Sequence, residues 1–510
     1  MVTSSSISKS YGRITVIMLL LFLGLAFRAS NINREFSGDE GLLVRIAGEP
    51  SGEVIRALKS TDAYPPLTYI FVHHMMKISR SAAWIRSYFI LFGIGVSILI
   101  YLIAKEYFDV KVAMIALALS VFSPLLIFLS QYARSYIDSA FWMLSATLFF
   151  IKIVRGGRSP LNWAGYIISA ALSLYTFYFS ILMLFAHFIF VTIFFGRNTR
   201  YLLGWYTAFG VSGLAFAAWA PSALAQFHNA SSLVFDWASK GFNVGALKIG
   251  LYMRNLFAVI GFDPFFMVFP EGTANKFFRP ALILAALLSA GLLLVFIRIA
   301  FRSLRERFGA DKKLVWLIPI LITVPLVTAW TMASAVNMMT TAKYLAAFHS
   351  LFLILLAFII YKTIEKNRIK GTVLLAVLLA IFAVRIPQAV SSEFDDKAVL
   401  NFLTNNVRLN EGFVCIRLPS ERWGVNVINI SPAIKLNEKG SDYILASKGV
   451  WEGCKDRARI FKKVWEYRVY GNDELFGANR LMDELLAEAG FKRTHINKFK
   501  NIDIVEYESR

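Results

Sequence analysis

Apolar runs long enough to cross a lipid bilayer recur along this chain, and they constrain its fold more than any other feature. A transmembrane helix needs about 20 predominantly apolar residues, with a range of roughly 17 to 25. Of the 510 residues, 57% are hydrophobic and 17% are charged, and the mean hydropathy is +0.57. A soluble domain of this length could not cover so much apolar surface with polar groups. The sequence therefore predicts an all-α polytopic membrane protein.

About eleven membrane spans are expected before residue 388. They are 13–28, 84–104, 112–129, 136–154, 161–177, 179–195, 201–221, 280–299, 314–333, 343–361 and 370–387. Only a short aromatic turn around Tyr178 separates the fifth span from the sixth. The first span follows Lys9 and Arg13 as a cleaved signal would, but no convincing small-residue cleavage site follows it. It is therefore interpreted as a retained anchor.

The net charge of +21 would suit a nucleic-acid-binding protein, but the distribution of the charge argues against that class. Basic residues gather in alternate loops: Lys152, Arg155, Arg158, Arg197, Arg200, Arg298, Arg302, Arg305, Arg307, Lys312, Lys313, Lys362, Lys366, Arg368 and Lys370. The loops 130–135, 176–180 and 334–342 contain almost none. This is the positive-inside pattern, which places the N-terminus and the basic loops in the cytoplasm. The positive charge is then expected to set the orientation of the protein in the membrane and to contact anionic lipids.

The same pattern places two long loops, 29–83 and 222–279, on the outer face, together with the tail. We expect a transmembrane module over 1–388 and a small extracytoplasmic α/β domain over 389–510. Apolar runs in the tail have the length of strands, at 412–416, 442–446, 459–465 and 502–507, and 479–490 has the leucine spacing and closing glycine of a helix. Cys415 and Cys454 both lie in this domain, where a disulfide and two buried thiols are both compatible with the sequence.

The outer loop 29–83 carries the first candidates for chemistry. Asp39 and Glu40 are adjacent carboxylates just beyond the first span. Charge near the membrane is unfavourable unless it has a role, and neighbouring carboxylates raise each other's pKa, which suits a group that must accept a proton. A solvated start of a loop explains the pair equally well.

Two cations stand alone in outer segments that are otherwise poor in positive charge. Arg134 precedes the span 136–154, and Lys343 lies at the outer end of the span 343–361. A guanidinium can hold a phosphate through two parallel hydrogen bonds, and an ammonium can neutralise a further phosphate oxygen. Each cation could instead anchor a helix end at the interface.

A proline pair gives the loop 29–83 a rigid segment. Pro65 and Pro66 follow Tyr64 and fix the backbone at the entry to an interfacial helix. His73 and His74 follow on that helix, where adjacent side chains point about 100° apart. Both histidines are therefore not expected on one metal, although one of them beside Asp39 or Glu40 would form a site for a divalent ion. Interfacial packing is the alternative.

The order of these motifs resembles a known family. Trp84-Ile-Arg-Ser87, Phe92-Gly93, Ser123-Pro124 and Ala133-Arg-Ser-Tyr136 follow one another as in the family 39-like, protein-mannosyltransferase-type and aminoarabinose-transferase-like glycosyltransferases with the GT-C fold. Asp39-Glu40 matches their acidic motif in the first outer loop. Tyr64-Pro-Pro-Leu is similar to their His-Pro-Pro-Leu motif, with Tyr64 replacing the histidine. Lys343-Tyr344 resembles a late Arg-Tyr pair, with Lys343 replacing the arginine.

The resemblance implies an integral membrane glycosyltransferase that moves a hexose or pentose from a polyprenyl-phosphate donor to an acceptor hydroxyl on the outer face. It implies Asp39 as general base, with Glu40 as its electrostatic partner or a metal ligand. The donor phosphate would contact Arg134, Lys343 and Tyr344. Tyr64, Pro65, Pro66 and Tyr136 would line the substrate pocket. No second carboxylate is placed as a nucleophile, so a single displacement with inversion is expected. The acceptor class (glycan, lipid or protein), metal dependence and oligomeric state stay open.

Two other classes of protein are compatible with many spans. A lipid or glycolipid transporter or flippase would carry ionisable residues at mid-bilayer and show repeat symmetry, whereas these spans are nearly free of charge. A non-catalytic membrane scaffold would not need the outer acidic and basic residues. Both remain alternatives to the enzyme.

Overall fold

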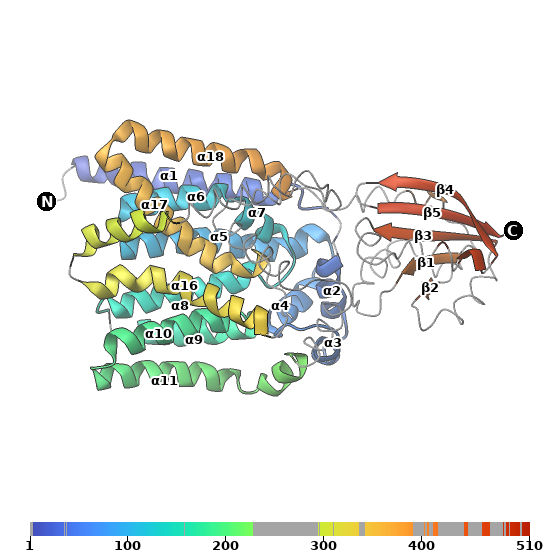
Figure 1. Ribbon diagram of the computed structural model, residues 1–510, viewed down its shortest axis with the longest axis horizontal. Coiled ribbons are helices and arrows are strands. Elements are labelled where there is room, and N and C mark those ends of the chain that lie inside the picture. The colour runs from blue at the N-terminus through green and yellow to red at the C-terminus, as the bar shows by residue number, and fades with distance from the viewer. Residues whose placement is uncertain are drawn as a thin grey trace.

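The computed structural model describes residues 4–34, 36, 38–157, 159–227, 294, 296–309, 311–335 and 342–390, with short segments between 402 and 509. Its described helical part is a bundle of long, roughly antiparallel helices (Figure 1). The long elements are α1 (Ser4–Ala29), α5 (Ala82–Tyr107), α6 (Val110–Phe122), α8 (Ile137–Val154), α9 (Pro160–Thr176), α10 (Ser180–Phe195), α11 (Thr199–Phe216), α16 (Lys312–Ala335), α17 (Ala346–Lys366, preceded by the 3-10 turn η1, Ala342–Leu345) and α18 (Arg368–Val390). The short helix α7 (Pro124–Gln131) follows α6.

The described helices fit an integral membrane protein. Six of them are long and apolar enough to cross a membrane, or eight if each of two bent pairs forms one span. The expected number of eleven is not confirmed. Two of the expected spans, 161–177 and 179–195, correspond to α9 and α10, which have 17 and 16 residues. Most of the expected span 280–299 lies outside the described residues.

The span expected at 112–129 is divided into two helices. The axes of α6 and α7 differ by 56° at Ser123-Pro124. The Ser123 side chain accepts a hydrogen bond from the Leu126 amide, and Pro124 occupies the first turn of α7. Because proline lacks an N–H and its φ suits a first helical residue, this Ser-Pro pair ends one helix and starts the next. α7 then leads into the 130–135 turn.

Burial differs strongly among the helices. In each helix we compare the share of residues that are buried within its most apolar 18-residue stretch. This share is 83% in the span that contains α17, 72% in α8 and 56% in α5, but only 11% in α1 and 17% in α18. The first group therefore forms the core of the bundle, and α1 and α18 present their apolar surface to the lipid. In Figure 1 these two peripheral helices run along the same side of the bundle.

A buried arginine fixes the C-terminal end of α1 to the core. Arg28 is fully buried, and its guanidinium donates to the hydroxyls of Ser130 and Ser97 at 3.1 and 3.3 Å and to the Gly24 and Ser120 carbonyls at 3.1 and 3.3 Å. These acceptors come from α1, α5, α6 and α7. A buried guanidinium is tolerated only when its donors are satisfied, so this contact specifies how the four helices meet.

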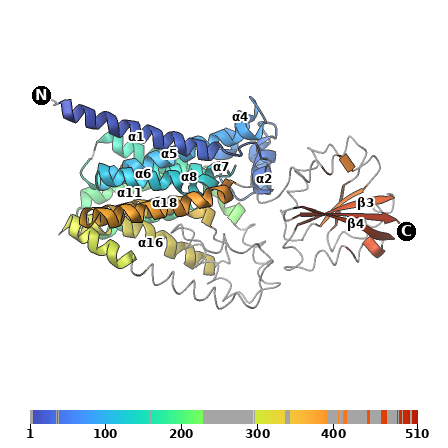
Figure 2. The ribbon, with the colours of Figure 1, turned by 90° about the horizontal axis from the view of Figure 1, so that it is seen from above.

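The two ends of the bundle differ in character. The short helices α2 (Gly38–Ala47), α3 (Val54–Thr61) and α4 (Leu67–Met76) lie at the end opposite the N-terminus, and the C-terminal sheet lies beyond them (Figures 1 and 2). Basic loops meet at the N-terminal end. Arg155 donates to the Tyr107 carbonyl at 2.8 Å, Arg307 to the Phe108 carbonyl at 3.1 Å, and Lys313 lies 4.5 Å from the Phe195 ring centroid. The loops expected to be cytoplasmic thus share one end.

The C-terminal part contains a five-stranded sheet in the order β2-β1-β3-β5-β4. Its strands are β1 (Gly412–Ile416), β2 (Tyr443–Ala446), β3 (Lys463–Val469), β4 (Phe491–Phe499) and β5 (Ile502–Ser509). β1 pairs in parallel with β2 and β3, and β5 pairs antiparallel with β3 and β4. Four strands coincide with or overlap the expected runs. β4 was not expected, because FKRTHINKF has little apolar content. Cys415 lies in β1, and Cys454 lies outside the described residues.

We expect Gly93→Ala to destabilise the protein, because the new methyl would overlap the Ser130 hydroxyl, lie 2.7 Å from Ser130 Cβ and approach Arg28 Nε to 3.2 Å. Overpacking of this kind costs about 1–3 kcal/mol. Thermal unfolding in detergent measures the effect. Gly210→Ala is the matched control, since a methyl added there would meet no atom within 4 Å. Equal unfolding temperatures for both variants would show that the contact between α1, α5 and α7 does not constrain the bundle.

Candidate active site

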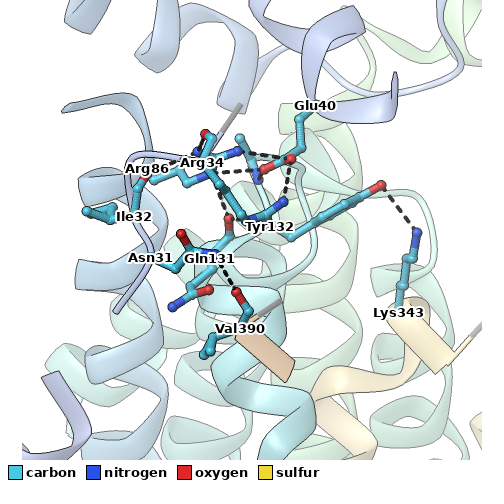
Figure 3. A network of polar contacts seen from close by, with 10 residues as sticks. Asn31, Ile32, Arg34, Glu40, Arg86, Gln131, Tyr132, Lys343 and Val390 are labelled. Carbon is cyan, nitrogen blue, oxygen red and sulfur yellow. Dashed lines mark hydrogen bonds and ion pairs between the residues drawn. The ribbon is translucent and has the colours of Figure 1, made fainter. Parts of the chain in front are cut away.

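A buried ion pair fixes the first turn of α2. Glu40 is fully buried, and Arg86 at the start of α5 contacts both of its carboxylate oxygens, with Nε–Oε1 and Nη2–Oε2 distances of 3.1 Å. Arg34 donates to Oε2 at 3.3 Å, and the Ala133 amide donates to Oε1 at 2.9 Å (Figure 3). The carboxylate is therefore neutralised and its geometry is fixed from three segments of the chain.

The same arginines hold the turn that follows α7. Arg86 Nε and Arg34 Nη2 both donate to the Gln131 carbonyl, at 3.0 and 3.1 Å. The Gln131 side-chain amide donates to the C-terminal end of α1, at the carbonyls of Phe27 and Arg28, and to the Ser30 carbonyl just after it. Figure 3 shows these contacts together with the bond from Asn31, in the segment after α1, to Val390 at the end of α18. The 130–135 turn and the start of α2 thus form one connected unit.

The charge of Glu40 is stabilised in this position. Burial alone would raise the pKa of its carboxyl, but Arg86 and Arg34, with hydrogen bonds from Arg86 and the Ala133 amide, hold that pKa below its ordinary value. Glu40 is therefore ionised at neutral pH and suits a structural or electrostatic role better than proton transfer. Asp39 precedes it in the first turn of α2, and the Asp39 side chain lies outside the described residues.

Arg134 belongs to a second buried cluster at the same end. Its Nη1 contacts Asp62 Oδ2 at 2.7 Å and the Tyr69 hydroxyl at 3.1 Å, and the Tyr69 hydroxyl donates to Asp62 Oδ2 at 2.6 Å. The guanidinium also lies over the Tyr64 ring, 4.2 Å from its centroid. Burial and the neighbouring Asp62 raise the pKa of Tyr69, although Arg134 opposes them, so the phenol stays protonated and donates.

An aromatic cluster joins Arg134 to Lys343. It consists of Tyr64, Tyr132, Tyr136, Phe177, Phe179 and Tyr344. The hydroxyls of Tyr64 and Tyr136 lie 2.7 Å apart, and the rings of Tyr136 and Tyr344 have centroids 5.6 Å apart. Lys343 Nζ donates to the Tyr132 hydroxyl at 3.2 Å and lies 4.5 Å from the Tyr132 ring centroid. Residues far apart in sequence, singled out from the motifs, thus meet around one cluster.

A third acidic group lies beside these contacts. Asp138, in the first turn of α8, is fully buried and accepts hydrogen bonds from the Thr68 hydroxyl at 2.7 Å, the Tyr88 hydroxyl at 3.2 Å and the Ser139 amide at 3.0 Å. Among the described residues no cation contacts its carboxyl. Thr68 is adjacent to Tyr69, which connects Asp138 to the Arg134 cluster through α4.

Sequence reasoning missed Asp62, Arg86 and Asp138. Arg86 lies within the motif Trp84-Ile-Arg-Ser87, and the site predicted from the sequence does not include Asp62 or Asp138. A signal existed for two of them: Asp62 lies two residues before Tyr64, and Asp138 lies two residues after Tyr136. Both acids are thus sequence neighbours of the tyrosines that meet in the aromatic cluster. Pro65 and Pro66 are buried before α4.

The residues considered for a metal do not fit one as they are placed. Glu40 is saturated by two arginines and an amide. His73 Nδ1 lies 2.8 Å from the Ala47 carbonyl and Nε2 lies 2.9 Å from the Ser51 hydroxyl, while His74 is exposed. Within the described ranges no three His, Cys, Asp or Glu side chains form a group that could hold a metal ion.

We expect Glu40→Gln to destabilise the protein by about 3–5 kcal/mol, because it leaves the buried Arg86 without its charged partner. A carboxyl whose pKa is lowered on folding stabilises the protein above its ordinary pKa of 4.5, and this contribution is lost as the pH falls through the lowered value. Unfolding temperatures measured from pH 7 downward should therefore decline below about pH 4.5, and the decline should be smaller in the variant.

Glu53→Gln is the matched control for Glu40→Gln. Glu53 pairs with Arg56 at 2.7 Å, but both side chains are exposed. Such surface pairs contribute about 0–1 kcal/mol. If Glu40→Gln were no more destabilising than this control, the buried pair would not hold α2 in place.

Comparisons with known proteins bear on this arrangement. Residues 63–224 match the model of a family described as dolichyl-phosphate-mannose-protein mannosyltransferase. A search of curated proteins finds no match. The match to the family model includes Tyr64, Arg134 and Tyr136, and it begins after Asp39 and Glu40.

Solved structures share the fold over nearly the whole chain. ArnT from Cupriavidus metallidurans bound to undecaprenyl phosphate is 9% identical, with a TM-score of 0.52 and 98% of each chain covered. The oligosaccharyltransferase AglB from Archaeoglobus fulgidus, in complex with an inhibitory peptide and a dolichol-phosphate, is 14% identical, with a TM-score of 0.53, and the match covers 98% of this chain and 74% of that one.

A further structure of the Archaeoglobus fulgidus oligosaccharyltransferase, in complex with Zn and sulfate, is 12% identical, with a TM-score of 0.52 and coverage of 95% of this chain and 73% of that one. Identities this low establish the fold alone. The fold expected from the motifs is confirmed: this chain has the GT-C fold of these membrane proteins.

Proposed function

We propose that the protein is an integral membrane glycosyltransferase that moves a sugar from a polyprenyl-phosphate donor to an acceptor hydroxyl on the outer face of the membrane. The match of residues 63–224 to a dolichyl-phosphate-mannose-protein mannosyltransferase family and the GT-C fold support this activity. Solved structures of that fold bind undecaprenyl phosphate and a dolichol-phosphate, which supports a lipid-linked donor here.

One contact carries the proposal. The Ala133 amide donates to Glu40 Oε1 at 2.9 Å. Asp39, the proposed base, immediately precedes Glu40, and Arg134, the proposed phosphate ligand, immediately follows Ala133. The proposed base and the proposed phosphate ligand are therefore sequence neighbours of the two residues that share this buried hydrogen bond. They are 95 positions apart in the sequence.

The proposed reaction is a single displacement. Asp39 takes the proton of the acceptor hydroxyl while the oxygen forms a bond to the anomeric carbon of the donor. The bond between that carbon and the phosphate oxygen breaks, and its electron pair leaves with the polyprenyl phosphate. Attack opposite the leaving group inverts the anomeric configuration. Positive charge from Arg134 and Lys343 stabilises the phosphate as its charge increases.

The contacts of the second cluster support this role for Arg134. Asp62 and Tyr69 contact one nitrogen of the guanidinium, Nη1, and the Tyr64 ring covers its face. A side chain held in this way reaches a ligand without further ordering, which is the physical advantage of a preorganised site. Lys343 reaches the same aromatic cluster through Tyr132. The donor phosphate would lie between these two cations, beside Tyr344.

The orientation in the membrane follows the basic loops. They share the end of the bundle that carries the N-terminus, while α2, α4 and the 130–135 turn lie at the other end (Figures 1 and 2). With the basic end in the cytoplasm, the proposed site and the C-terminal sheet face outward. Nucleotide sugars are cytoplasmic, so a donor supplied through the bilayer fits this location.

We expect Asp39→Asn to lower the turnover of a polyprenyl-phosphate sugar by roughly 10²- to 10⁴-fold, the contribution of a general base. Release of polyprenyl phosphate from purified protein is the measurement. Glu53→Gln, an exposed carboxylate on the segment before α3, should keep wild-type turnover. Equal turnover of Asp39→Asn and wild type, with both proteins folded, would remove Asp39 from the mechanism.

We expect loss of Arg134 to raise KM for the lipid donor roughly ten- to 100-fold, the effect of losing a hydrogen bond to a charged group. Arg134→Gln alone would leave Asp62 buried without its cation, so the informative variant is the double substitution Arg134→Gln/Asp62→Asn. It should recover unfolding temperature relative to Arg134→Gln while KM stays high. Recovery of both quantities would assign the ion pair a purely structural role.

A further inference from the structure

The described residues also form a cavity far from the proposed active site. It has a volume of about 530 Å³ and is lined by Arg298, Phe301, Arg302, Arg305, Glu306 and Trp316. The helical segment 296–308 and the first turns of α16 provide these residues. α16 begins at this basic end of the bundle, whereas Lys343 follows at the other end. The cavity is therefore separate from the site proposed for the donor phosphate.

The cavity has an excess of positive charge. Arg298, Arg302 and Arg305 are four and three positions apart, so they lie on one face of their helix. Glu306 pairs with Arg302, with an Nε–Oε1 distance of 3.0 Å. Within the described part of the chain no carboxylate pairs with Arg298 or Arg305. Between 298 and 313 the sequence has six basic and two acidic residues. An anion would complement this charge.

Aromatic and apolar side chains adjoin the charges. Trp316 is 41% exposed, and its ring meets Phe301 edge to face with centroids 4.8 Å apart. Tryptophan is typical of the level where lipid headgroups meet the acyl chains. Leu294 and Ile297 on the preceding turns are also exposed. The surface changes from charged to aromatic to apolar. A phospholipid changes in the same order, from its charged headgroup through the glycerol region to its acyl chains.

We propose that this cavity binds the headgroup of an anionic phospholipid from the leaflet at the basic end. The phosphodiester would lie among the three arginines, the glycerol region against Trp316, and one acyl chain along Leu294 and Ile297. A free phosphate would use the arginines alone, because it has no acyl chain to cover the exposed apolar residues. The apolar surface therefore favours a lipid over a soluble anion.

The test compares lipids on purified full-length protein in neutral detergent. Retention of phosphatidylglycerol and of phosphatidylcholine is measured by native mass spectrometry, and the unfolding temperature is followed in parallel. We expect preferential binding of phosphatidylglycerol. The triple substitution Arg298→Gln/Arg302→Gln/Arg305→Gln should weaken that binding by roughly ten- to 100-fold, since each basic residue near a lipid surface contributes severalfold.

Two controls distinguish specific binding of the lipid in this cavity from nonspecific electrostatic attraction of anionic lipid to basic residues. Lys362→Gln/Lys366→Gln/Lys370→Gln removes the same charge from another loop at this end, and it should leave phosphatidylglycerol binding close to wild type. Trp316→Ala keeps the charge and should reduce binding of the lipid. Equal losses in the two triple variants would overturn the proposal, because bulk charge would then explain binding.

A third arm of the experiment distinguishes the source of the anion. Inorganic phosphate, at concentrations equal to that of the lipid headgroup, should neither raise the unfolding temperature nor displace phosphatidylglycerol. If inorganic phosphate stabilised the protein as strongly as the lipid and competed with it, the cavity would be an anion site without lipid specificity. An acidic peptide that displaced the lipid in wild type but failed to bind the arginine variant would point to a protein partner instead.

Discussion

The buried contact between Glu40 and Arg86 is the interaction on which the end of the bundle that carries α2 and α4 depends. A carboxylate and a guanidinium that are both removed from water must satisfy each other, since either one alone would be strongly unfavourable. Here the pair also receives Arg34 and the Ala133 amide. The segment 34–40, the start of α5 and the turn after α7 are thereby assembled around one charge. The Arg134 cluster and the aromatic cluster adjoin this turn, so their positions depend on the same contact.

The fold class was predictable because membrane burial imposes long apolar helices, and those are visible in a sequence. The helix break between α6 and α7 was less visible, since Ser123-Pro124 lies inside a continuous apolar run and only the cap geometry divides it. β4 was missed for the opposite reason. Its FKRTHINKF sequence is mostly polar, and it becomes a strand at the edge of the sheet by pairing with β5.

The candidate site was predictable in part. Arg134 and Lys343 stood out as lone cations in segments with few charges, and Tyr136 as part of a motif that resembles the GT-C glycosyltransferases. The structure brings all three to one aromatic cluster. Their partners could not be inferred in the same way. Asp62 and Arg86 are ordinary polar residues in a loop and at a helix start, and their importance arises only from tertiary contacts across 72 and 46 positions of sequence. Pattern alone does not encode such pairings.

The left-handed backbone of Asn31, with φ of 57°, allows its side-chain amide to donate to the Val390 carbonyl at 2.9 Å. This bond joins the segment after α1 to the end of α18, although the two residues are 359 positions apart in the sequence. Since α18 is the last long helix among the described residues, this bond cannot form until the helices that precede it have been synthesised and inserted. The segment that leads from α1 to Glu40 is thus joined to α18 only after that helix is in place.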